Sequence, residues 1–179
     1  PNPHNRQPWQ FDLVGEDRID VYVDLERRLP HTDPFDRQIT IGFGCMLELL
    51  RIAAAERGYH AEITPFPDGQ AYPRLNGNRI AQVRFSEVTS PDRDPLFASI
   101  LERRSTKEPY DTGRPVEQGA INGIIAGGAG TLEIGGTIDP AQRDRIIALA
   151  WQGFEIELAT DLTRRESVDL MRIGNREIV

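Results

Sequence analysis

The sequence predicts an α+β fold in which strands and helices are interspersed and one helix is strongly apolar. Residues 18–24 alternate strictly between polar and apolar side chains, which is typical of a half-buried strand. Between Asp33 and Gly58, and again after Asp139, apolar residues recur at helical spacing. Because strands and helices are interspersed along the chain, these patterns favour the α+β class.

The first half predicts an ordered loop, two strands and the apolar helix. Residues 1–9 are too rich in proline and amides for a helix, and a short strand is expected at Trp9–Leu13. Asp33 is a suitable N-cap with Pro34 at the first helical position, and Gly58 is a suitable stop. The helix between them is apolar around most of its circumference, so we expect it in the core or at an interface.

The second half alternates strand and helix patterns. Asp139-Pro140, with Gln142 three residues into the helix, is a strong helix start. The other expected elements are strands at 61–66, 79–88 and 131–138, a helix capped by Asp94-Pro95 that runs to about Glu102, and helices at 117–126, 139–160 and 161–177.

Composition excludes several function classes. The 179 residues, 39% of them hydrophobic, suit one globular domain or slightly more. A net charge of −7 argues against nucleic-acid binding and against a polybasic membrane patch. Cys45 is the only cysteine and the three histidines are scattered, so we expect no disulfide and no metal site. No run of about 18 apolar residues predicts a membrane span.

The segment Pro1–Trp9 combines three prolines with the side-chain amides of Asn2, Asn5 and Gln7. A stiff loop with fixed donors and acceptors suits the edge of a flat heteroaromatic ligand. A surface loop that only caps a strand, with Trp9 as a core anchor, explains the same residues.

The segment Arg103-Arg104-Ser105-Thr106-Lys107 is the second candidate. Two guanidinium groups and a hydroxyl at the end of a helix suit a phosphate and its sugar alcohols. Basic residues also complement the dipole at the end of an ordinary helix.

Both segments resemble elements of the nitroreductase superfamily. Asn5-Arg6-Gln7-Pro8-Trp9, preceded by Pro1, is similar to the family's P-S-x-x-N-x-Q-P-W element, which lies beside the flavin. Asn2 and Pro3 stand where the family has small hydroxyl residues. The second segment, with Tyr110-Asp111 after it, resembles the family's N-terminal flavin-binding signature. The resemblance implies FMN as cofactor, with contacts from these residues: Pro1, Asn2, Pro3, Asn5, Gln7, Arg103, Arg104, Ser105 and Lys107.

The resemblance also assigns roles within that set. Arg103, Arg104 and Ser105 would contact the ribityl phosphate, and Lys107 the pyrimidine edge of the flavin. A positive charge there stabilises the reduced ring. No catalytic acid or base is expected, because the flavin supplies the chemistry.

The order of the two elements is reversed relative to ordinary family members, which are homodimers with flavin sites shared between subunits. A tandem duplication explains the reversal. Residues 1–102 would be most of a first repeat and 103–179 the start of a second, forming a pseudo-dimer with a nitroreductase-like mixed sheet flanked by helices. Residues 127–133 of the second repeat lack the Asn-x-Gln-Pro-Trp pattern, so we expect one FMN per chain. We therefore expect a monomer that acts as a pseudo-dimer, or a weak homodimer.

The implied function is transfer of hydride from NAD(P)H through FMN to a nitroaromatic, quinone or similar flat acceptor. A protein that binds or sequesters FMN without catalysis, and a scaffold that binds no flavin, are the alternatives. The two-repeat pattern is similar to that of Acg-type proteins, and residues 37–50 and 166–174 resemble a bacterial group whose precursors often carry twin-arginine signals. We therefore expect a bacterial protein with sequence missing at both ends. It would be periplasmic if such a signal precedes Pro1 and cytoplasmic otherwise.

Overall fold

The computed structural model describes residues 2–106, 108–128 and 133–171. The chain forms two compact units. The first contains residues 1–104 together with 165–179, and the second contains residues 105–164. The predicted repeat boundary at 102/103 rests on family resemblance, and the duplication itself stays a prediction.

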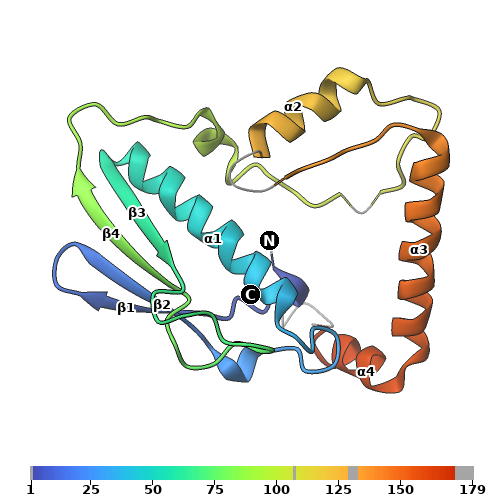
Figure 1. Cartoon of the computed structure of the whole chain (residues 1–179), viewed down its shortest axis with the longest axis horizontal. Helices are drawn as coiled ribbons and strands as arrows, with labels where there is room; N and C mark the ends of the chain where they lie inside the picture. Colours follow the sequence, from blue (N-terminus) through green and yellow to red (C-terminus); the bar gives the residue numbers. More distant parts are fainter. Residues whose placement is uncertain (1, 107, 129–132, 172–179) are drawn as a thin grey trace. The chain divides into compact units, whose positions relative to one another are not determined.

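The first unit is built on a four-stranded sheet with the order β1-β2-β4-β3 (Figure 1). The strands are β1 (Trp9–Val14), β2 (Arg18–Val23), β3 (Tyr59–Pro65) and β4 (Ala81–Glu87), close to the predicted ranges. All three pairings are antiparallel, so the expectation of a mixed sheet is wrong for this sheet. The short turn at Gly15, whose φ is +65°, returns the chain directly into an antiparallel neighbour.

Helix α1 (Arg37–Glu56) begins three residues later than the predicted start at Pro34. Asp36 has a φ of 54°, in the left-handed region, so a helix cannot run through it. Asp33 still caps the helix from a distance, because its carboxylate accepts hydrogen bonds from the backbone N–H groups of Arg37 and Ile39, both at 2.9 Å. The predicted stop is confirmed, since Gly58 follows the helix with a φ of +86°.

One face of α1 packs against the sheet to form the core of the first unit (Figure 1). By length and mean hydropathy, 1.4, α1 could cross a membrane. A share of 33% of its apolar stretch is buried, on the face that packs against the sheet, while Ile41 and Leu49 on the other side are exposed. The buried core consists mainly of Val21, Val23, Ile39, Phe43, Leu47, Ala54, Ala61, Leu75, Ile80, Ala81 and Val83.

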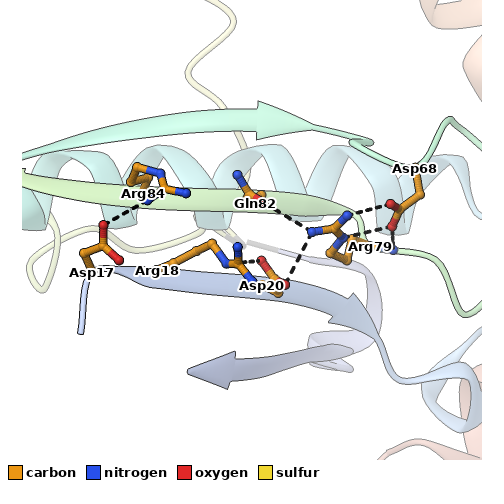
Figure 2. A network of polar contacts seen from close by, with 7 residues as sticks. All are labelled: Asp17, Arg18, Asp20, Asp68, Arg79, Gln82 and Arg84. Carbon is orange, nitrogen blue, oxygen red and sulfur yellow. Dashed lines mark hydrogen bonds and ion pairs between the residues drawn. The ribbon is translucent and has the colours of Figure 1, made fainter. Parts of the chain in front are cut away.

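The opposite face of the sheet carries an ionic network (Figure 2). Alternation predicts that Asp20 faces solvent, but this residue is only 5% exposed. Arg18 covers it with an Nε–Oδ1 distance of 3.3 Å, and Arg79 approaches its other oxygen at 3.5 Å. Arg79 also pairs with Asp68 at 2.6 Å and donates to Gln82 at 3.2 Å. Long arginine stems therefore bury a carboxylate on the polar side of a strand.

The predicted helix after Asp94 is a short 3-10 turn, η3 (Pro95–Ser99), which ends before Glu102. Asp94 caps it as expected, accepting a hydrogen bond from the backbone N–H of Leu96 at 2.8 Å. The Leu96 side chain is exposed, so little apolar burial is available to extend the turn into an α-helix.

The second unit contains helices α2 (Gln118–Gly128) and α3 (Pro140–Ala159), and α4 (Asp161–Asp169) continues from it into the first unit. The start of α3 is confirmed, because Asp139 accepts a hydrogen bond from the backbone N–H of Gln142 at 2.8 Å. The strand predicted at 131–138 is absent from 133–138, and positions 131 and 132 lie outside the described residues. Two consecutive glycines, Gly135 and Gly136, weaken any strand there. The predicted helix to Glu177 ends at Asp169, and residues 172–177 also lie outside the described part.

Candidate functional site

The loop before β1 has an unusual backbone. After Asn2 the chain makes a 3-10 turn, η1 (Pro3–Asn5), in which His4 and Asn5 have φ values of 48° and 51°. Gln7 follows with a φ of 48°. Non-glycine residues in this region cost roughly 1–3 kcal/mol each, although asparagine tolerates it best. The loop is closed by a hydrogen bond of 2.8 Å from the backbone N–H of Gln7 to Asn2 Oδ1.

Reciprocal arginine contacts hold this loop against the turn η2 (Leu25–Arg27). Arg6 donates through Nε to the carbonyl oxygen of Arg27 and through Nη2 to that of Glu26, both at 3.1 Å. Arg27 in return donates to the carbonyl oxygen of Arg6 at 3.3 Å. A backbone hydrogen bond of 2.7 Å from Asp24 to Pro8 fixes the end of the loop. The strained backbone is therefore held by contacts on both sides.

The loop ends in the core and presents two amides outward. Pro8 is fully buried, and the Trp9 ring meets Phe43 edge to face with 6.0 Å between centroids. Trp9 is thus a core anchor, as expected also for a surface loop that only caps a strand. Asn5 and Gln7 are exposed, and their side chains make no hydrogen bond within the described part of the chain. These two amides remain available to a ligand.

The other predicted loop contacts differ in accessibility. The side-chain oxygen of Asn2 already accepts the hydrogen bond from Gln7, and Pro3 lies in the 3-10 turn. Pro1 lies outside the described residues. Neither Asn2 Oδ1 nor the Pro3 ring supplies the free hydroxyl found at these positions in the family pattern.

The second predicted segment crosses the boundary between the two units. Arg103 and Arg104 end the first part of unit one, Ser105 begins unit two, and Lys107 lies outside the described residues. Arg103 donates its backbone N–H to Ser99 at 2.9 Å. The Arg104 side chain bonds the carbonyl oxygens of Leu101 and Arg103, at 2.6 and 2.9 Å. Both arginines and Ser105 are exposed. Their assembly with the loop before β1 into one site stays a prediction.

Sequence reasoning missed a groove beside the start of α1. A cavity of 570 Å³ is lined by residues that include Phe35, Tyr72, Arg37 and Arg74. Beneath it, the fully buried carboxylate of Asp36 accepts a hydrogen bond from the Leu75 backbone at 3.0 Å. Asp33 and Pro34 predict only a helix start, and the local pattern holds no signal that Phe35 and Arg37 line a groove with residues 70–75. Within 2–106, 108–128 and 133–171, no group of three or more metal-ligating side chains occurs.

Glu166 fixes the end of the described chain to the first unit. Its carboxylate accepts hydrogen bonds from the Thr32 hydroxyl and backbone N–H, both at 2.7 Å, and from the His31 backbone at 3.2 Å. Partial burial alone would raise the Glu166 pKa, but these hydrogen bonds outweigh burial and hold the pKa below its ordinary value. This contact joins residues more than 130 positions apart.

Comparison with known proteins identifies distant relatives in Mycobacterium tuberculosis. The chain is 34% identical to an uncharacterized protein over 118 residues, which are 63% of this chain and 33% of that protein. It is 35% identical over 114 residues to a protein named "Putative NAD(P)H nitroreductase acg", covering 62% and 32% of the two chains. A second protein whose name begins "Putative NAD(P)H nitroreductase" is 26% identical over 121 residues, covering 68% and 33% of the two chains. No family model matches.

The chain is thus similar, over about two thirds of its length, to two proteins whose names call them putative NAD(P)H nitroreductases. The chain spans about a third of the length of the curated relatives that it matches.

Proposed function

We propose that this chain is part of an FMN-dependent oxidoreductase of the nitroreductase type, which takes hydride from NAD(P)H and reduces a nitroaromatic, quinone or similar flat acceptor. The observation that carries the proposal is the loop before β1. It is rigidly held, it has a costly backbone, and it exposes the amides of Asn5 and Gln7. Strained backbone that neighbouring contacts over-determine is typical of ligand sites. Two distant relatives named "Putative NAD(P)H nitroreductase" agree with it.

The residue types of the two segments suit FMN in chemistry. Arg103, Arg104 and Ser105 are exposed and offer guanidinium and hydroxyl donors for a phosphate. Asn5 and Gln7 offer both donors and acceptors for the polar edge of a flavin. Lys107, placed by resemblance alone, would add a positive charge at that edge. The bound group would supply hydride and electron transfer.

The protein's own contribution is positioning and electrostatics. Because the loop before β1 is already fixed by Arg6 and Arg27, binding would cost little conformational entropy. Cations near the FMN phosphate would stabilise its negative charge, and a cation near the flavin ring would stabilise negative charge that develops on the ring. No ionisable side chain of the loop is required to move a proton.

The deciding experiment is FMN binding followed by anaerobic reduction. The chain purified without added flavin would be examined for flavin absorption bands, titrated with FMN by fluorescence quenching, and then titrated with NADH and NADPH. Binding followed by bleaching supports the proposed oxidoreductase. Binding without bleaching would favour an FMN-sequestering protein. Failure to take up FMN would refute the proposal.

Variants separate the proposed contacts from unspecific charge effects. Loss of one charge-assisted hydrogen bond is worth about 1.5–3 kcal/mol, so Arg103→Ala should weaken FMN binding by roughly 10- to 100-fold. Gln7→Ala should weaken it by about fivefold, the value of a neutral hydrogen bond. Arg114→Ala removes an exposed arginine outside the predicted segment and is the matched control. An equal effect of Arg114→Ala would show that only bulk charge matters.

A further inference from the structure

The groove beside the start of α1 is built by two segments of the first unit (Figure 1). Phe35, Arg37 and Ile41 come from the start of α1 and the residues just before it. Tyr72 and Arg74 come from the loop between β3 and β4. The volume of 570 Å³ lies within the range of about 300–1,000 Å³ that is typical of small-molecule sites. None of the described residues that line the groove belongs to the two segments proposed to contact FMN, so it is a separate candidate site.

Exposed aromatic surface forms one part of this groove. Tyr72 is 94% exposed and Phe35 is 59% exposed. Single exposed apolar side chains are common on protein surfaces, but these two come from segments more than 30 positions apart and line the same hollow. Ile41 adds an exposed aliphatic side chain to the same lining. Aromatic surface in a concave site suits a flat ring, which can stack on it or meet it edge to face.

The polar part of the groove is cationic. Among the described residues that line it, two are arginines and none is an aspartate or a glutamate, although the whole chain carries a net charge of −7. Arg37 is exposed, and its side chain makes no hydrogen bond or ion pair within the described part of the chain. Guanidinium groups bind phosphate through paired hydrogen bonds. The charge of the lining therefore favours an anion.

A buried carboxylate holds the second arginine in place. Asp36 is fully buried, and its Oδ2 lies 3.8 Å from Nε of Arg74 and 3.4 Å from Nη1 of Arg28. Two guanidinium groups thus share one carboxylate, which leaves positive charge in excess. The Arg74 side chain makes no hydrogen bond within the described residues, so its donors remain available. Asp33, the other carboxylate at this helix start, is already bonded to backbone N–H groups of α1.

We propose that this groove binds a flat aromatic ring that carries a phosphate group, as in a purine mononucleotide. The ring would pack on Tyr72 and Phe35, and the phosphate would accept hydrogen bonds from Arg37 and Arg74. A neutral ring would leave both guanidinium groups without a partner, and a free phosphate would leave the aromatic surface exposed. Recognition therefore requires both parts of the ligand, and it does not depend on FMN binding elsewhere in the chain.

Isothermal titration calorimetry of the 179-residue chain tests the ring and the charge separately, with AMP, adenosine and inorganic phosphate as probes. AMP should bind with a Kd below about 1 mM, and at least about tenfold more tightly than adenosine or inorganic phosphate, because only AMP engages both parts of the groove. Absence of AMP binding would overturn the proposal. Inorganic phosphate that binds as tightly as AMP would also overturn it, because the groove would then be only a cationic patch.

One pair of variants tests the charge. Arg37→Gln should weaken AMP binding by about 10- to 100-fold, the value of a charge-assisted hydrogen bond. Arg57→Gln removes the same charge from an exposed position at the other end of α1 and is the matched control. Both side chains are exposed, so circular dichroism should show the fold unchanged. An equal effect of the two variants on AMP binding would contradict the proposed phosphate contact.

A second pair of variants tests the ring. Tyr72→Phe keeps the aromatic face and should bind AMP as the unaltered chain does. Tyr72→Leu keeps an apolar side chain but removes that face, so it should weaken binding by about tenfold, the value of one stacked base. If Tyr72→Phe and Tyr72→Leu bind AMP equally well, stacking on Tyr72 is excluded and the proposal fails.

Competition with FMN separates this groove from the proposed flavin site. Saturating FMN should leave the affinity for AMP unchanged, and so should Gln7→Ala, because the described lining residues of the groove are distinct from the proposed FMN contacts. Displacement of AMP by FMN, together with loss of both ligands in Arg37→Gln, would show that the groove belongs to the flavin site and would overturn the proposal. AMP binding by a chain that takes up no FMN would support the groove and refute only the proposed function.

Discussion

The buried capping carboxylate of Asp33 should be among the most sensitive positions in the first unit. Asp33 is 4% exposed and accepts hydrogen bonds from two backbone N–H groups at the start of α1. Asp33→Ala removes both acceptors without creating a path for water. The backbone N–H groups of Arg37 and Ile39 would then lack a partner. Ile39 is fully buried, so water could not replace the lost acceptor there.

The size of the effect follows from these two hydrogen bonds. Loss of an ordinary N-cap costs about 1 kcal/mol, and burying a donor without a partner costs about 1–3 kcal/mol. We therefore expect Asp33→Ala to destabilise the first unit by about 3 kcal/mol. At roughly 3 °C per kcal/mol for a protein of this size, the Tm should fall by about 9 °C.

Thermal unfolding followed by circular dichroism measures this loss. Asn76 is the matched control in the same unit, because it accepts one backbone hydrogen bond, from Asn78 at 2.9 Å, in an exposed turn. Asn76→Ala should lower the Tm by no more than about 3 °C, since water replaces the lost acceptor. Asp33→Asn keeps one acceptor oxygen, so its fall in Tm should lie between those of Asp33→Ala and Asn76→Ala. If Asp33→Ala lowers the Tm no more than Asn76→Ala does, the buried Asp33 cap does not contribute the stability expected of it.

Three further predictions follow from single contacts. Phe43→Ala should cost about 3–5 kcal/mol in urea unfolding, because its fully buried ring would leave a cavity. The hydrogen bond from Arg79 lowers the Asp68 pKa to about 2, so NMR titration should find this pKa there and Arg79→Gln should return it towards 3.8. The lowered Glu166 pKa means that its contribution to stability is present above pH 4.5 and is lost as pH falls through the folded-state value. Stability should therefore fall less below pH 4.5 in Glu166→Gln than in the unaltered chain. Thr32→Val should reduce this difference without abolishing it, because it removes one of the three hydrogen bonds and leaves the two from backbone N–H groups.

Local patterns predicted most of the secondary structure because each rests on a short-range cause. Alternation predicted β2, Gly58 predicted the end of α1, and Asp139 predicted the start of α3. The misses depend on contacts between distant residues. Asp20 is buried because Arg18 covers one of its oxygens and Arg79, 59 positions away, approaches the other. The start of α1 was displaced because Asp36 takes a left-handed conformation while its carboxylate accepts the Leu75 N–H.

The site was predictable in residue type but not in geometry. Motif resemblance selected Asn5 and Gln7, and the structure leaves both amides exposed. The same resemblance selected Asn2, whose side-chain oxygen is used inside the loop. Sequence alone could not distinguish these roles, because the difference depends on which backbone N–H each amide meets after the chain turns. The segment from Arg103 was expected at a helix end, but it follows a 3-10 turn and crosses into the second unit.

The backbone of the loop before β1 is the strongest physical link between fold and proposed function. Left-handed conformations at His4, Asn5 and Gln7 cost free energy that a simple strand cap would not require. This cost is sustained because Arg6 is bonded to the neighbouring turn and because Trp9 is packed in the core. A loop that only covered a strand could relax into extended backbone without losing the Trp9 anchor. The retained strain therefore favours a loop whose exposed amides must stand in one fixed orientation, as recognition of a flat ligand requires.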